Sequence, residues 1–309
     1  MSVLPRVPAV SDDWNILSAR ASFASHRLVG WIYWDPFALA GCARLGLDEP
    51  GIYYITSRAA PLAPAGHSAV AAAFYSIHPF FIEVSMAVAA ERTTFAAITQ
   101  VRDDAVARGL RDYVPEICAG LAALADPLWE AADALPLSGR VLFAAHRQQP
   151  RLADPVLSAW LAINCIREWR ADTHFAVLAS EDISATQAGL LHNAFLNYPQ
   201  DWIPRSRGSD DAALATGLAD LQERGLATAG QVNDAGLALR QRIEERTDAL
   251  TQRAWRLLGR ERTEAYLDLV EPVGSRLLAR IDDTAGPEWM PAARLRRVAP
   301  QQSAARTEL

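Results

Sequence analysis

Apolar positions recur along most of the chain at the three- and four-residue spacing of amphipathic helices, and alternating runs are nearly absent. Alanine and leucine, which favour helices, dominate these segments, and runs of β-branched residues are scarce. The pattern therefore predicts a mainly α-helical fold.

The first part of this pattern predicts a multi-helix domain over residues 1–182 that holds a ligand pocket. An apolar segment over 68–90 is interrupted at His78-Pro79, where the residue before proline leaves the helical conformation easily. Residues 91–135 predict two or three amphipathic helices. We therefore expect a helical bundle in this part of the chain.

Two Asp-Pro pairs predict helix starts, because aspartate is a good N-cap and proline fits the first helical position. Asp126-Pro127 predicts a start within residues 91–135. Asp154-Pro155 predicts the start of a long helix that ends near Ser180.

A second domain is predicted over 183–298, where Ser184 and Gln187 form a capping box. Its elements follow in the order of a degenerate winged helix-turn-helix: a helix over 185–198, a loop over 199–208, a helix over 210–224 capped by Ser209, short extended pieces over 226–232, and a long helix over 234–258. A C-terminal helix over 261–282 and a disordered tail over 299–309 complete the prediction.

The long helix that begins at Pro155 carries a cluster of charged residues between apolar ones. Arg167, Arg170 and His174 share one helical face, and Glu168 and Asp172 share another. Charges in an apolar setting must be paired or hydrogen-bonded, because an isolated buried charge is strongly unfavourable. The cluster is therefore a candidate site.

Two interpretations of this cluster remain open. In the first, arginines hold an anionic or carbonyl group, His174 moves a proton, and Glu168 or Asp172 orients it. In the second, the same residues form an ion-pair network between helices. His146 precedes the loop that leads into the long helix, so it either approaches the cluster as a second acid/base or stabilises a helix C-terminus. The residue spacing argues against a metal site, and no cofactor is predicted.

Other residues outside the cluster are candidate ligand contacts. Arg58 is either a second arginine that binds an anionic group or a residue at a surface corner of the chain. His78 is either a ligand contact or a histidine packed in the core. Aromatic side chains that line a pocket for a flat organic ligand, or pack in the core, are Tyr33, Trp34, Phe74 and Tyr75.

Composition limits the function classes. The chain has 309 residues, 50% of them hydrophobic and 21% charged, with a net charge of −6. Three widely spaced cysteines form no disulfide framework or metal pair, which fits a reducing cytoplasm. No apolar run reaches the roughly 18 residues of a membrane span, and no signal peptide is present, so no membrane partner is predicted.

The charges of the winged-helix segment argue against DNA as a partner. The helix over 210–224 carries four acidic residues and a single arginine, and residues 227–232 carry no lysine or arginine. We therefore expect the winged helix to serve packing or dimerisation. Glu244, Glu245 and Asp248 alternate with arginines, which is typical of a solvated or dimer-facing surface and compatible with a homodimer.

Several blocks carry a family resemblance: Ser57-Arg58-Ala59-Ala60-Pro61-Leu62, Ala73-Phe74-Tyr75 with His78-Pro79, Leu142-Phe143-Ala144-Ala145 with Arg147, Arg167-Glu168-Trp169-Arg170-Ala171-Asp172-Thr173-His174, and Gly225-Leu226 through Gly236 to Ile243-Glu244-Glu245-Arg246-Thr247-Asp248. In order and spacing they resemble the SalK-like family of actinobacterial proteins, which are described as carrying a helix-turn-helix domain. The chain departs from that pattern at His146, Trp169, Ala171 and Thr173, so no chemistry can be carried over.

The resemblance implies a role beside natural-product pathways. The leading hypothesis is a small-molecule-handling protein of specialised metabolism, a tailoring enzyme that uses the Arg/His/carboxylate cluster for acid/base chemistry on a small-molecule ligand. One alternative is a ligand-responsive winged-helix transcription regulator. Another is a structural or partner-binding protein without catalysis.

Overall fold

The computed structural model of the chain describes residues 12–295, so the predicted tail over 299–309 lies outside the described residues. The described part is mainly α-helical, as the sequence predicts, and its β structure is one two-stranded hairpin. No helix in this part is both long and apolar enough to cross a membrane.

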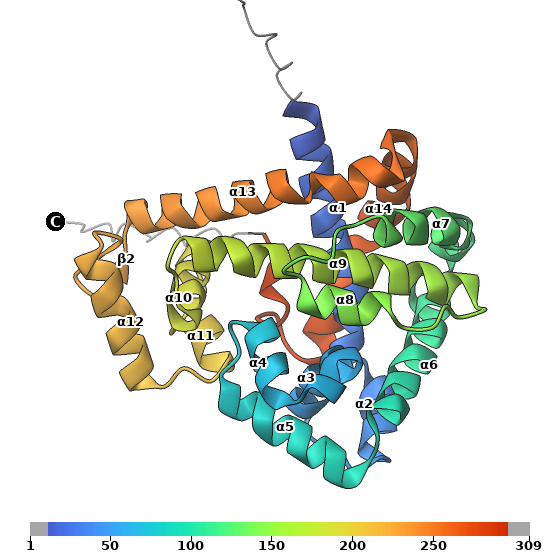
Figure 1. Cartoon of the computed structure of the whole chain (residues 1–309), viewed down its shortest axis with the longest axis horizontal. Helices are drawn as coiled ribbons and strands as arrows, with labels where there is room; N and C mark the ends of the chain where they lie inside the picture. Colours follow the sequence, from blue (N-terminus) through green and yellow to red (C-terminus); the bar gives the residue numbers. More distant parts are fainter. Residues whose placement is uncertain (1–11, 296–309) are drawn as a thin grey trace, which may run out of the picture.

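Figure 1 shows the elements coloured in chain order, and we divide them into two runs at the turn between α7 and α8. The first run consists of α1 (Asp12–Gly30), the 3-10 turn η1 (Trp31–Trp34), α2 (Pro36–Ala43), α3 (Pro50–Ala59), the 3-10 turn η2 (Ala60–Ala65), α4 (His67–Phe74), α5 (Pro79–Arg92), α6 (Phe95–Tyr113) and α7 (Pro115–Asp133). The second run consists of α8 (Val141–Arg147), α9 (Pro155–Ser180), α10 (Ala185–Leu196), α11 (Trp202–Ser206), α12 (Asp211–Glu223), β1 (Ala227–Thr228), β2 (Gln231–Val232), α13 (Asp234–Leu258), α14 (Arg260–Thr284) and the 3-10 turn η3 (Pro291–Ala293).

The elements α10 to α13 form a winged helix-turn-helix. The capping box at Ser184 is present, and Asn233 caps α13 by accepting the Gly236 amide. The hairpin is antiparallel, with Ala227 opposite Val232. Two details differ from the expectation: a short helix, α11, lies in the predicted loop, and Asp210 rather than Ser209 caps α12.

The main core lies where α1, α7, α9, α13 and α14 meet. Its largest fully buried side chains include Trp160 and Trp169 of α9, Trp255 of α13 and Tyr266 of α14. The domain boundary predicted at residue 182 lies in the turn between α9 and α10, yet α13 and α14 return to this core. Figure 1 shows α13 lying alongside α9 for much of its length. Residues on both sides of the predicted boundary therefore stabilise one core.

Local helix signals succeed at one Asp-Pro pair and fail at the other. Asp154 accepts the amides of Val156 and Leu157 and begins α9, as predicted. Asp126-Pro127 does not begin a helix, because Pro127 lies inside α7. There the burial of apolar side chains against α9 outweighs the hydrogen bond that proline removes. The predicted break at His78-Pro79 is present between α4 and α5.

Candidate functional site

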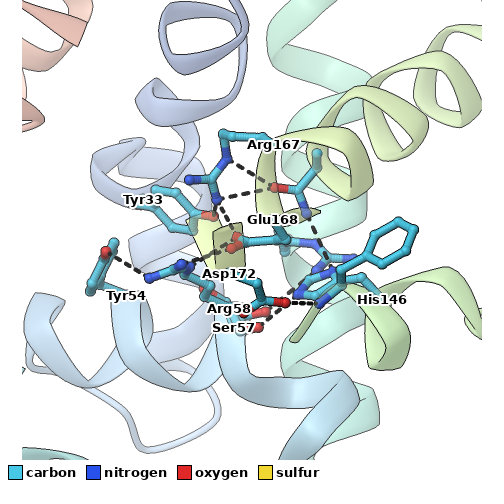
Figure 2. A network of polar contacts seen from close by, with 11 residues as sticks. Tyr33, Tyr54, Ser57, Arg58, His146, Arg167, Glu168 and Asp172 are labelled. Carbon is cyan, nitrogen blue, oxygen red and sulfur yellow. Dashed lines mark hydrogen bonds and ion pairs between the residues drawn. The ribbon is translucent and has the colours of Figure 1, made fainter. Parts of the chain in front are cut away.

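Glu168 is the centre of a buried network that joins α3, η1 and α9 (Figure 2). Its side chain is 0% exposed. Arg58 donates two hydrogen bonds to its carboxylate, from Nε at 2.9 Å and Nη2 at 2.7 Å. Arg167 donates to the same carboxylate and, at 3.0 Å, to the hydroxyl of Tyr33. Burial by itself raises the pKa of Glu168. The positive charges of Arg167 and Arg58 outweigh this effect and lower the pKa from its usual 4.5 to about 2.

His146 joins this network from α8. The Arg58 carbonyl oxygen can only accept, so the contact of 3.0 Å with His146 Nε2 places the ring proton on Nε2. His146 Nδ1 then accepts from the Asn164 amide at 3.4 Å. Burial lowers the pKa of His146 to about 4, which keeps the ring neutral at neutral pH. Both ring nitrogens are engaged inside the protein.

Asp172 lies one turn beyond Glu168 and anchors the start of α8. Its Oδ2 accepts the Phe143 amide at 2.9 Å, so a carboxylate of α9 satisfies a free amide in the first turn of another helix. Burial raises the pKa of Asp172 to about 7. α8 is thus held at one end by Asp172 and near the other by His146.

Arg170 and His174 lie apart from this network, on the side of α9 that faces α13. Arg170 pairs with Glu244 and, at 2.7 Å, with Asp248. The hydroxyl of Thr247 donates to a backbone carbonyl and therefore accepts from His174 Nδ1 at 3.0 Å. The expectation of a solvated or dimer-facing surface is wrong for Glu244 and Asp248, because both carboxylates neutralise Arg170 inside the molecule, whereas Glu245 is exposed.

The predicted aromatic residues make packing contacts: Tyr33, Trp34 and Phe74 are buried, and Tyr75 is half-buried. The Arg58 guanidinium lies 4.5 Å from the centre of the Phe74 ring, and Trp34 stacks on Tyr54. Tyr75 packs against α9 and donates its hydroxyl to the carbonyl of Ile183. His78 is exposed, and its Nδ1 caps α5 by accepting the Phe80 amide at 3.2 Å.

Space beside the network is small. The gap between α1, α9 and α13, lined by Arg167 and Arg170 among others, is too narrow for a water molecule. A cavity of about 310 Å³ lies between α7 and α14, and none of the predicted site residues lines it. Residues 12–295 contain no group of three or more His, Cys, Asp or Glu side chains placed to hold a metal ion. The geometry supports an ion-pair network between helices, and the catalytic and binding roles stay predictions.

Two network residues were not identified from the sequence. Tyr54 approaches Arg58 Nη1 at 3.5 Å, and Asn164 accepts from Arg167 at 3.2 Å. Tyr54 lies four residues before Arg58, and Asn164 lies three before Arg167. The i, i+3 and i, i+4 spacings on a helix were therefore usable signals for these two residues.

The winged helix presents a second candidate site, the outer face of α12 with the hairpin. Leu214, Gly217 and Leu221 of α12 are buried, whereas Ala212, Thr216 and Ala219 are exposed. Arg205 pairs with Asp211 at 2.7 Å, and Arg224 donates to the carbonyls of Glu181 and Asp182. This face is therefore small-residue-rich and polar, with arginines at its two ends.

Comparison with known proteins bears on this second site. A family model described as a helix-turn-helix family matches residues 18–284. No curated protein and no solved structure matches the chain. The match confirms the predicted helix-turn-helix relationship, whereas the narrower SalK-like assignment stays a prediction.

The match also corrects the expectation that DNA is not a partner. A helix-turn-helix docks one helix in the major groove, so membership of such a family speaks for DNA binding. The number of cationic side chains governs affinity for phosphates, and few lie on the winged-helix segment. DNA binding also depends on a helix and a hairpin that fit a groove, and α12 with β1 and β2 supplies both.

Proposed function

The chain belongs to this helix-turn-helix family, and on that premise we propose that it is a DNA-binding regulator. In this proposal the outer face of α12 enters the major groove of duplex DNA and the β1–β2 hairpin lies beside it. The order α10, α11, α12, hairpin and α13 supports the assignment of α12 as the recognition helix.

The exposed residues of α12 suit contact with base edges more than with phosphates. Ala212 and Ala219 are small enough for close approach, and alanine and threonine methyl groups pack against the thymine methyl group. Thr216 adds a hydroxyl that donates or accepts. Phosphate contacts would come from the ends of the helix, where Arg205 and Arg224 are exposed.

The regulator would respond to events in the first part of the chain through α13. This helix starts directly after the hairpin, and Arg170 of α9 pairs with its Glu244 and Asp248.

A gain-of-binding experiment tests the proposed DNA contact. Ala215→Lys adds a cation to an exposed alanine of α12 that is not assigned a base contact, and Ala72→Lys adds one to an exposed alanine of α4 as the matched control. A fluorescent duplex in low salt is titrated with each protein. We expect Ala215→Lys to tighten binding roughly tenfold, as one further phosphate contact predicts, and Ala72→Lys to change it less than about twofold. Absence of binding by the wild-type protein at low salt would refute the proposal.

A further inference from the structure

The two runs of helices repeat one plan. The long helices of the first run are α1 at its start and α6 and α7 at its end. The long helices of the second run are α9, which follows the short α8, and then α13 and α14, which precede the short turn η3. A single residue separates the last two helices in both runs, Val114 in the first and Gly259 in the second. We call the first run the first half of the chain and the second run the second half. Both halves share the order of their core-forming helices.

The last helix of each half carries a proline at the same place. Pro127 is the thirteenth residue of α7, and Pro272 is the thirteenth residue of α14. The surrounding sequences, Leu124-Ala125-Asp126-Pro127-Leu128 and Leu269-Val270-Glu271-Pro272-Val273, share leucine, acid, proline and an apolar residue at equal spacing. Proline inside a helix is unfavourable, so its presence at one equivalent position indicates a common plan.

Four of the core-forming helices, α1, α7, α9 and α14, pack as the elements of a symmetric dimer do. The other pair departs from this pattern, because α13 packs extensively against α1 and α9 whereas α6 contacts α9 only weakly. α1 of the first half packs against α14 of the second, and α9 of the second half packs against α7 of the first. α1 also contacts α9, and α7 contacts α14, so equivalent helices meet each other. In a dimer with a twofold axis, each helix at the interface contacts the equivalent helix of the other subunit. The contacts of α1 with α9 and of α7 with α14 follow this rule.

The two halves differ in the segment that carries the recognition helix and the hairpin. Where the second half has α12 and a hairpin, the first has α4 followed directly by α5. α4 packs against α8 and η2, and its Val70 and Phe74 are buried. The turn after α4 contacts the second half, where the His78 amide donates to the Arg207 carbonyl at 2.8 Å. Among the described residues, α12 and its hairpin form the one complete recognition unit.

We infer that the chain is a covalent pseudo-dimer, in which the first half takes the place of a second subunit and a single copy binds one half-site of duplex DNA. Dimeric helix-turn-helix proteins bind two half-sites about one helical turn apart, so their sites are palindromic. One recognition unit per molecule predicts an asymmetric site instead. The DNA part of this inference rests on the proposed function, whereas the pseudo-dimer part does not.

Selection and mass measurement test the two parts separately. The full chain selects binding sequences at low salt from a duplex library with a random core of about 30 base pairs, roughly three helical turns. Light scattering gives the mass of the free protein, and native mass spectrometry gives the stoichiometry on the selected duplex. We expect a monomer, a motif without inverted repeats, and one chain per duplex.

Each other outcome overturns a defined part of the account. A dimeric free protein overturns the pseudo-dimer, and an inverted repeat that holds two chains overturns single-copy binding. Failure to select any duplex overturns the proposed function and the DNA part, while the free mass still tests the pseudo-dimer.

A matched pair of variants tests which half docks. Thr216→Glu places a negative charge on the outer face of α12, and Ser68→Glu does so at an exposed hydroxyl residue of α4. We expect Thr216→Glu to weaken binding to the selected duplex roughly tenfold or more and Ser68→Glu less than about twofold. Equal losses in the two variants, with unchanged circular dichroism spectra, contradict docking through the second half alone.

Discussion

Removing the charge of Glu168 tests whether the buried network stabilises the protein. The substitution Glu168→Gln keeps the size of the side chain and removes the only carboxylate that Arg58 and Arg167 share. Both arginines are then left as buried cations. The loss of one member of a buried ion pair is strongly unfavourable, because the remaining charge has neither water nor a partner.

Two arguments give the magnitude. Breaking a buried pair costs about 3–5 kcal/mol in the free energy of unfolding. Independently, the pKa of Glu168 falls from 4.5 in the unfolded chain to about 2 in the folded protein. At roughly 1.4 kcal/mol per pKa unit, this shift corresponds to about 3 kcal/mol of stability. A depressed carboxyl pKa stabilises the protein above pH 4.5, and this contribution is lost as the pH falls toward 2.

Urea denaturation at pH 7, followed by far-ultraviolet circular dichroism, measures the difference. We expect Glu168→Gln to lower the free energy of unfolding by about 3–5 kcal/mol. The control Glu116→Gln removes an exposed ion pair with Arg276 and should cost less than about 1 kcal/mol. Equal effects of the two substitutions, or a difference that does not shrink between pH 4.5 and 3, would refute the reasoning.

Three further predictions follow from single contacts. The pKa of Asp172 rises from 3.8 to about 7, so its ionisation destabilises the fold as the pH rises through this range; Asp172→Asn should therefore raise the melting temperature at pH 8 and leave it unchanged near pH 4. In Gly236→Ala, the added Cβ would lie 2.4 Å from the Leu226 carbonyl oxygen, which displaces the hairpin; urea denaturation should show a loss of about 1–3 kcal/mol, and an unchanged stability would contradict this close packing. Asp154→Ala removes the N-cap of α9, and we expect a loss of about 1 kcal/mol in the same assay, well below that of Glu168→Gln.

Local signals in the sequence predicted the starts of α9, α10 and α13. The cap residues Asp154, Ser184 and Asn233 accept hydrogen bonds from amides of their own helices. The signal for each of these helix starts therefore lies within a few residues of the sequence. Asp126-Pro127 misled, because its helix is determined by packing against α9. The repeat of Pro127 and Pro272 became meaningful only with the helix bounds, since proline is much more common at helix starts than inside helices.

The site was predicted in part for a similar reason. The sequence identified the charged residues of α9 but not their partners, because Arg58 and Glu168 are brought together by tertiary packing. Arg167 and Arg170 were expected to act together, yet they pair with carboxylates of different helices, Glu168 and Glu244. Helical spacing gives the direction of a side chain and leaves open which helix it meets.

The salt dependence of DNA binding tests the central proposal most directly. Fluorescence anisotropy of a labelled duplex, titrated at a series of salt concentrations, gives the number of phosphates that the protein contacts. With Arg205 and Arg224 beside α12 to contact phosphates, we expect a slope of log affinity against log salt of about −2, or a loss of roughly 12-fold between 50 and 200 mM salt. No detectable binding at the lowest salt concentration would contradict a DNA-binding function for this chain.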